Sequence, residues 1–320
     1  MAREDTLSEL HAPSHGQEIF ERDIRHRANV LGVGVDAFDM EQALSRLAME
    51  LRNNRKGYVC AIDVHGILEA IHDPQLAETF ARSSMALPDG APTVWVGRLQ
   101  GHRHIDHVTG PDLMLEVFGQ REFAGYTHFL YGGKAGVAEE LAATLCKRFR
   151  SARIVGTYTP PFRDLDAREE EGLIARIEEL KPDIIWVGIG APKQDLFMRR
   201  MLPCMRTRMM IGVGAAFDFH TGRIRGCPPW VKRAGFQWLH RLAQDPRRLW
   251  RRNLKNMSFL WHIATQLSGF RNFPLAKRTA TLEYLASPST QPLTPAFLPS
   301  ESARSGVLEP RSVDRACSGD

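Results

Sequence analysis

Several features that define other protein classes are scarce in this chain of 320 residues. Its five cysteines, Cys60, Cys146, Cys204, Cys227 and Cys317, lie far apart and form no C-x-x-C pair. This spacing excludes a disulfide scaffold, argues against a structural zinc site and favours a reducing compartment. The 26 glycines follow no triplet period, which excludes a collagen-like chain.

Long apolar runs are missing as well. The longest one, 184–191, is far shorter than the roughly eighteen residues needed to cross a bilayer. The first residues carry acids and no apolar stretch, so no secretory signal is expected. With 43% hydrophobic and 25% charged residues, the composition is typical of a globular protein. We therefore expect a cytoplasmic protein, or one on the cytoplasmic face of the membrane.

Acidic residues are almost absent from one segment. Between Arg223 and Lys255 there are ten Lys or Arg residues and one acid, Asp245. Six aromatic residues lie between Trp230 and Trp261, in and just beyond this segment. Such a field predicts an anionic partner: phosphates, lipid head groups or nucleic acid.

The rest of the chain alternates strand and helix patterns. Short β-branched or apolar runs predict strands at 29–35, 57–62, 85–87, 127–131, 153–157, 184–189 and 209–213. Apolar residues at helical spacing predict helices at 40–51, 67–82 (interrupted near Asp73), 135–149, 172–180 and 194–202. This alternation predicts an α/β fold with a doubly wound, mainly parallel sheet.

Composition divides the chain into four parts. A polar lead-in, 1–26, precedes the α/β core, 27–222. The basic aromatic segment, 223–275, is expected to be a helical appendage. The last part, 276–320, is rich in Ser, Pro and Thr and is expected to be disordered.

Three predicted strands end in glycine-rich turns, at 131–134, 188–194 and 212–218. Glycine lets backbone N–H groups approach a phosphate, and a following helix N-terminus favours negative charge. One such turn is ordinary in this fold, but three in one sheet favour a nucleotide or sugar-phosphate ligand. None matches a dinucleotide fingerprint or a Walker A loop.

Carboxylates follow two other predicted strands. Asp89 lies in the turn Leu87-Pro88-Asp89-Gly90, where a general base and a simple turn residue are equally good interpretations. Asp63 and His65 follow the strand 57–62 and should reach the same rim, with His65 the more ordinary surface or packing residue. Asp112 is interpreted as part of a helix cap beginning at Thr109.

The basic segment has two specific interpretations. Its arginines at 247, 248, 251 and 252 form one cationic face at helical spacing. They could clamp a pyrophosphate, because guanidinium groups donate bidentate hydrogen bonds, or hold the segment on anionic lipid. Both roles are compatible.

Taken together, these motifs resemble the WecG/TagA/CpsF family of bacterial glycosyltransferases, from about Asn29 to Asn253. The resemblance rests on seven stretches in order: VLGVGVDAFDM, LPDGAPTVW, VTGPDLM, FLYGGKAG, VGIGAPKQD, GVGAAFDFHTG and FQWLHRLAQDPRRLWRR. It implies a Rossmann-like core with a membrane-touching appendage. It also implies inverting, metal-independent sugar transfer without a cofactor, and association between copies in some members.

The implied donor is a UDP-sugar and the implied acceptor is a saccharide on undecaprenyl diphosphate, for a surface polymer. The resemblance makes Asp89 the catalytic base. The substrate-binding residues that we expect from the motifs and the resemblance are Asp63, Gly90, Tyr131, Gly132, Gly133, Gly190, Pro192, Lys193, Gln194, Gly214, Asp218, Arg241, Arg247, Arg248, Arg251 and Arg252. Members commonly have Thr-x-Asn where this chain has Ala61-Ile62-Asp63, and an acid there disfavours an acidic sugar nearby.

Two other functions remain as alternatives. An NAD(P)-dependent oxidoreductase would use the same doubly wound sheet, although the dinucleotide fingerprint is missing. A nucleic-acid-binding protein would use the Arg and Trp residues of the basic segment, and the strand-end turns would then have no function. The motifs favour the transferase, for which no nucleic-acid partner is expected.

Overall fold

The protein is described here by a computed structural model, covering residues 27–224, 226, 231, 243 and 258–275. Its centre is a sheet of six strands in the order β4-β3-β8-β7-β5-β6, and each adjacent pair is parallel. The strands are β3 (Gly57–Ile62), β4 (Met85–Pro88), β5 (His128–Gly132), β6 (Ile154–Tyr158), β7 (Ile184–Gly188) and β8 (Met209–Gly212). The predicted parallel α/β fold is confirmed.

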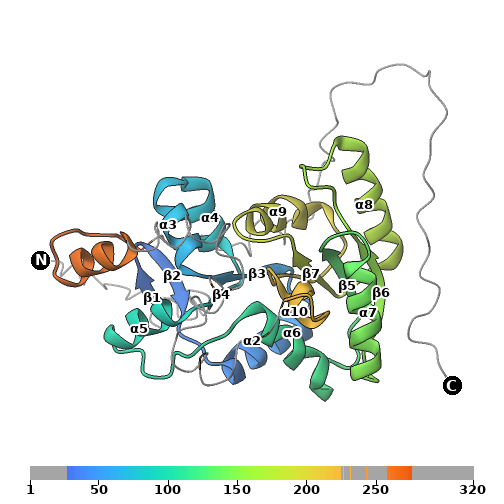
Figure 1. Cartoon of the computed structure of the whole chain (residues 1–320), viewed down its shortest axis with the longest axis horizontal. Coiled ribbons are helices and arrows are strands. Elements are labelled where there is room, and N and C mark those ends of the chain that lie inside the picture. The colour runs from blue at the N-terminus through green and yellow to red at the C-terminus, as the bar shows by residue number, and fades with distance from the viewer. Residues whose placement is uncertain (1–26, 225, 227–230, 232–242, 244–257, 276–320) are drawn as a thin grey trace, which may run out of the picture.

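Helices cover both faces of this sheet (Figure 1). One layer holds α3 (Val64–His72), α4 (Pro74–Arg82), α8 (Ala167–Leu180) and α9 (Lys193–Met201). The other holds α2 (Met40–Arg52), α6 (Gly110–Gly119), α7 (Val137–Arg148) and α10 (Ala216–His220). The single-turn helices η1 (Arg121–Phe123) and η2 (Leu202–Cys204) follow α6 and α9.

The two layers give the protein two apolar cores, because side chains alternate across the sheet. On β3, for example, Tyr58, Cys60 and Ile62 join the core beneath α9, while Val59 joins the core on the α7 side. All six residues of this strand are buried, as expected for a parallel strand covered on both faces. This rigid sheet fixes where the strand-end turns lie.

The predicted strand at 29–35 is wrong in one respect. The segment forms an antiparallel hairpin of two short strands, β1 (Arg27–Val30) and β2 (Val33–Asp36). Its turn holds Leu31 and Gly32 at positive φ, an unusual conformation for leucine that the apolar sequence does not announce. A buried ion pair between Arg27 and Asp36, 3.1 Å apart, closes the open end of the hairpin.

Residues 258–267 are helical and pack on this hairpin (Figure 1, orange). The Gln266 side chain accepts a hydrogen bond from the Leu31 N–H (2.9 Å) and donates one to the Asn29 carbonyl (2.9 Å). Phe259 and Ile263 are buried on the same side. Leu260, Trp261 and Leu267 of the same helix are exposed.

The helix α5 (Ala91–Leu99), which the sequence pattern did not predict, contacts the other side of the hairpin through β1. Its C-cap residue Gln100 bonds both the N–H and the carbonyl of Asn29. Asn29 thus ties α5 and the helical residues 258–267 to one hairpin. In the part of the chain that the structure describes, no helix is long and apolar enough to span a membrane.

Two of the described cysteines are free thiols: Cys60, which is buried, and Cys204, which is exposed.

Candidate active site

Five turns gather at one edge of the sheet. They follow β4, β3, β8, β7 and β5, which are consecutive neighbours in the sheet. Because these strands are parallel, their carboxyl ends meet at the same edge, where ligands of doubly wound folds bind. We call these turns (62–66, 88–91, 132–136, 188–193 and 212–216) the rim.

Asp89 lies at the rim between β4 and α5. Its N–H donates to the carbonyl of Ile62, 3.2 Å away, so the turn is tied to the end of β3. Gly90 follows at φ +123° and caps α5, a conformation that side-chain-bearing residues rarely adopt. The half-buried Asp89 therefore sits just before a helix N-terminus, where negative charge is favoured.

Asp63 is the N-cap of α3. Its carboxylate accepts a hydrogen bond from the Gly66 N–H at 2.8 Å, which satisfies one of the open donors of the helix. His65, in the first turn of α3, lies 3.9 Å from Glu69 in an ordinary i,i+4 pair. Asp63 therefore has a capping role at the rim, and His65 fits the surface interpretation.

The turns after β5 and β7 touch each other through glycine. A Cβ on Gly132 would stand 2.5 Å from the carbonyl oxygen of Gly188, a distance that side chains do not tolerate. The Gly133 N–H donates to that same carbonyl at 3.2 Å. Only glycine at position 132 lets these two turns meet, so both belong to one surface.

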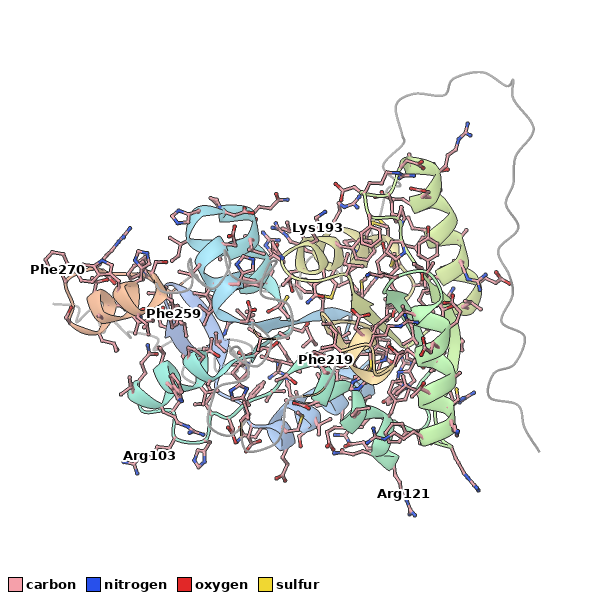
Figure 2. The ribbon with its side chains drawn as sticks, viewed as in Figure 1. Arg103, Arg121, Lys193, Phe219, Phe259 and Phe270 are labelled. Carbon is pink, nitrogen blue, oxygen red and sulfur yellow. The ribbon has the colours of Figure 1, made fainter. Side chains whose placement is uncertain are left out.

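Gln194 stabilises the turn that follows β8. Its side chain is buried, and its carbonyl oxygen accepts a hydrogen bond from the Gly214 N–H at 3.0 Å. Gly190 and Gly214 both adopt positive φ. Pro192, joined to Ala191 by a cis peptide bond, caps α9, and the next residue, Lys193, is exposed (Figure 2). The turn thus pairs an exposed cation with a helix N-terminus.

Tyr131 does not line the rim with its ring. The ring is 2% exposed and stacks between Tyr158, at 5.6 Å, and Phe197, at 4.5 Å. Burial raises the pKa of the Tyr131 hydroxyl well above its usual value. Tyr131 therefore supports β5 and α9, and an exposed lysine, Lys134, follows its glycine turn.

The start of α6 closes the rim beside β8. Thr109 caps the helix by accepting from the Asp112 N–H, as predicted. Gly110 packs so tightly on Val213 that an added Cβ would lie 2.6 Å from its Cα. Asp218 lies on the half-exposed side of α10, which contacts α6.

The predicted diphosphate-binding arginines, Arg241, Arg247, Arg248, Arg251 and Arg252, lie outside the described residues. Among the residues that are described, no three His, Cys, Asp or Glu side chains converge in a way that could hold a metal ion. The described rim thus offers two carboxylates, Asp63 and Asp89, together with backbone N–H groups and two lysines.

The family model for the WecG/TagA/CpsF glycosyl transferases matches residues 28–272, most of the chain. The chain belongs to this family. It is similar to the N-acetylglucosaminyldiphosphoundecaprenol N-acetyl-beta-D-mannosaminyltransferase of Bacillus subtilis (strain 168). The two are 27% identical over 185 residues, which cover 58% of this chain and 70% of the relative.

Membership confirms the predicted enzyme class, a glycosyltransferase, over the oxidoreductase alternative. In this transferase, sequence reasoning missed one residue that the structure sets apart. Asp195 directly follows the predicted Pro-Lys-Gln turn, yet its carboxyl group is buried inside α9. A signal was present, since an acid in the apolar register of that helix (Phe197, Met198, Met201) is unusual.

Proposed function

We propose that this transferase moves a sugar, with inversion, from a UDP-sugar to a saccharide on undecaprenyl diphosphate, for a bacterial surface polymer. The observation that carries the proposal is the meeting of five strand-end turns at one rim, with Asp89 among them. The Bacillus relative, whose name specifies an N-acetylglucosaminyl diphosphoundecaprenol acceptor, supports this acceptor class and an N-acetylhexosaminyl donor.

Asp89 would act as the general base. It accepts the proton of the acceptor hydroxyl as that oxygen attacks the anomeric carbon from the face opposite the departing UDP. The C–O bond to UDP breaks as the new glycosidic bond forms, so one displacement inverts the configuration. A positioned base of this kind contributes roughly a hundredfold or more to the rate.

The leaving diphosphate needs positive charge. Lys134 and Lys193 follow the turns of adjacent strands, β5 and β7, and both are exposed. Glycine turns and the N-terminus of α9 add backbone donors for phosphate oxygens. The arginines of the appendage remain predicted partners for the diphosphates of donor and acceptor.

The acceptor lies in a membrane, and the hairpin end of the molecule fits that requirement. Exposed apolar residues gather on the elements that flank the hairpin: Trp95 and Leu99 on α5, and Leu260, Trp261, Leu267 and Phe270 in the described C-terminal segment. Phe270 is 87% exposed and lies at the outer edge of the molecule (Figure 2). Aromatic and aliphatic side chains of this kind insert into the interface of a bilayer. We therefore place the enzyme on the inner face of the cell membrane, without a spanning segment among the described helices.

The test is a donor and acceptor matrix. The full-length enzyme is incubated with N-acetylglucosaminyl diphosphoundecaprenol and, separately, with UDP-N-acetylmannosamine, UDP-N-acetylglucosamine, UDP-glucose and NADH. We expect one of the N-acetylhexosamine donors to be consumed, and the product linkage, assigned by NMR, to be β from an α-linked donor. Retained configuration would rule out the single displacement. Lack of transfer from any UDP-sugar would rule out the donor class.

A further inference from the structure

A buried carboxyl group lies directly beneath the rim. Asp195 is the third residue of α9, and its side chain is 1% exposed. Its helix packs on β3, β7, β8 and α4. Within the described residues, neither carboxyl oxygen finds a nitrogen or oxygen hydrogen-bond partner. Burying a polar group without such partners is costly, so the site requires an explanation.

The group that interacts with Asp195 is a thiol. Cys60 on β3 is fully buried, and its thiol interacts with the Asp195 carboxyl group without reaching hydrogen-bond geometry at either oxygen. Burial raises the pKa of the Cys60 thiol well above its usual range, with the charge of Asp195 adding to the effect, so the thiol keeps its proton at neutral pH. A thiol is a weak donor, and it compensates a buried negative charge poorly.

The polar and charged groups around Asp195 do little to stabilise its ionised form. Asp63, beyond the end of β3, is negative and opposes a second negative charge. Tyr58, on the same face of β3, donates its hydroxyl to the Thr79 carbonyl instead. From α4, Glu78 and Arg82 also face α9, where Glu78 pairs with Arg199 at 2.6 Å and Arg82 pairs with Glu78. The strands β7 and β8 contribute no titratable side chain.

The neutral form of Asp195 is therefore favoured. Desolvation is the largest effect on its pKa and raises it; the Cys60 thiol opposes this in part, and the negative charge of Asp63 adds a smaller rise, so that the pKa is about 7. The start of a helix would favour the ionised form, but by less than burial disfavours it. Asp195 thus changes charge in the range where a cytoplasmic enzyme works.

We propose that protonated Asp195 is a positioning residue that holds the first turn of α9 against β3, and that loss of this proton loosens the rim. The two residues before it connect it to that surface. Gln194 holds the turn after β8 through the Gly214 N–H, and Lys193 stands exposed at the rim. The stability part of this inference stands alone, whereas the effect on substrate rests on the proposed function.

The sign of the pH dependence follows from linkage. Asp195 binds its proton more tightly in the folded state than in the unfolded state, where its pKa is the ordinary 3.8. Stability is therefore lost as pH rises from about 4 to about 7, and the loss is constant above that range. An asparagine of the same shape takes no part in this titration.

The first measurement is thermal unfolding of the full-length protein from pH 5 to pH 8.5, for the wild type and Asp195→Asn. We expect the Tm of the variant to rise relative to the wild type across this range, by about 5 °C or more. The matched control is Asp183→Asn at the opposite end of the sheet. Asp183 accepts hydrogen bonds from the Thr127 N–H and hydroxyl, so its loss should lower Tm at every pH.

Parallel Tm curves for the wild type and Asp195→Asn would overturn the proposal. If Asp195→Asn does not fold, Cys60→Ala carries the test, because it removes the thiol that stabilises the ionised carboxylate. The fall in Tm between pH 5 and pH 8.5 should then be larger than in the wild type. An unchanged fall would equally overturn the proposal.

The second measurement is the dissociation constant of UDP at pH 6 and pH 8.5. UDP changes its own charge over this range, so the readout is the ratio of the dissociation constant of the wild type to that of Asp195→Asn at each pH. The wild type should lose about threefold or more affinity relative to Asp195→Asn, and a constant ratio would remove the link to the rim. If neither protein binds UDP, the proposed donor class fails, while the Tm comparison still decides the role of Asp195.

Discussion

The rim of the parallel sheet and the hairpin end of the molecule are built for different surroundings. The rim consists of glycine turns, helix N-termini and single polar side chains, including Asp89 and Lys193. The hairpin end exposes large apolar side chains, including Trp261 at 70% and Phe270 at 87% exposure. The first surface suits a charged, water-soluble nucleotide sugar, and the second suits a lipid interface. An enzyme that joins a soluble donor to a lipid-linked acceptor needs both.

The largest effect is expected from a change in the rim, at Asp89. We expect Asp89→Asn to lower turnover roughly a hundredfold or more, because the amide cannot take the acceptor proton. Binding to vesicles should not change. The measurement is steady-state transfer to lipid-linked acceptor, together with Tm. Asp106→Asn, an exposed carboxylate in the nearby loop, is the control and should keep full activity. Near-normal turnover of Asp89→Asn would remove this residue from the role of base.

A change at the hairpin end should instead affect membrane binding and leave the chemistry intact. The double substitution Trp261→Ser and Phe270→Ser should weaken binding to vesicles of anionic phospholipid about tenfold to a hundredfold, because two large apolar side chains no longer enter the interface. Transfer to a water-soluble acceptor analogue should be retained. Sedimentation with vesicles measures the effect. Phe162→Ser, which changes an equally exposed residue after β6, should bind as the wild type does. Unaltered binding of the double variant would place the anchoring surface elsewhere.

The link between the C-terminal segment and the hairpin is tested by Gln266→Leu. The change removes both hydrogen bonds of Gln266 and leaves the Leu31 N–H and the Asn29 carbonyl with one partner fewer. A loss of about 1 to 3 kcal/mol is expected, which lowers Tm by roughly 2 to 4 °C for each kcal/mol. An unchanged Tm would mean that Phe259 and Ile263 alone hold the segment.

The smallest effect is expected at Lys193. An exposed lysine that meets a diphosphate contributes modestly, so Lys193→Ala should raise the KM for the UDP-sugar about threefold to tenfold and leave kcat nearly unchanged. Lys181→Ala, at the far end of the sheet after α8, is the matched control. A fall in kcat with constant KM would assign Lys193 to the transition state instead of to donor binding.

Much of the core could be predicted because strand and helix patterns are local. Apolar runs and helical spacing predicted each of the six sheet strands and the helices α2, α7, α8 and α9. The hairpin was missed because Leu31, at positive φ, carries no turn signal. Helix α5 was missed because its apolar residues lie all around the helix, some against the hairpin and others exposed.

The rim was harder to predict than the sheet. Strand ends could be placed from the sequence, and with them Asp63, Asp89 and the glycine turns. Whether a side chain at a strand end points outward depends on neighbours that only the fold supplies. Tyr131 was expected to bind substrate, but the rings of Tyr158 and Phe197 enclose it. Asp195 was passed over, although the packing of α9 on β3 buries it.

The contact between Gln266 and the hairpin has a consequence for biosynthesis. Leu31 and its partner are 235 positions apart in the chain. At the usual pace of bacterial or eukaryotic ribosomes, about 5 to 20 residues per second, one emerges roughly ten to fifty seconds before the other. During that delay the apolar side of the hairpin has no cover from Phe259 and Ile263. The nascent chain would need a chaperone, or the membrane surface that we propose for the folded enzyme, to cover these residues during that delay.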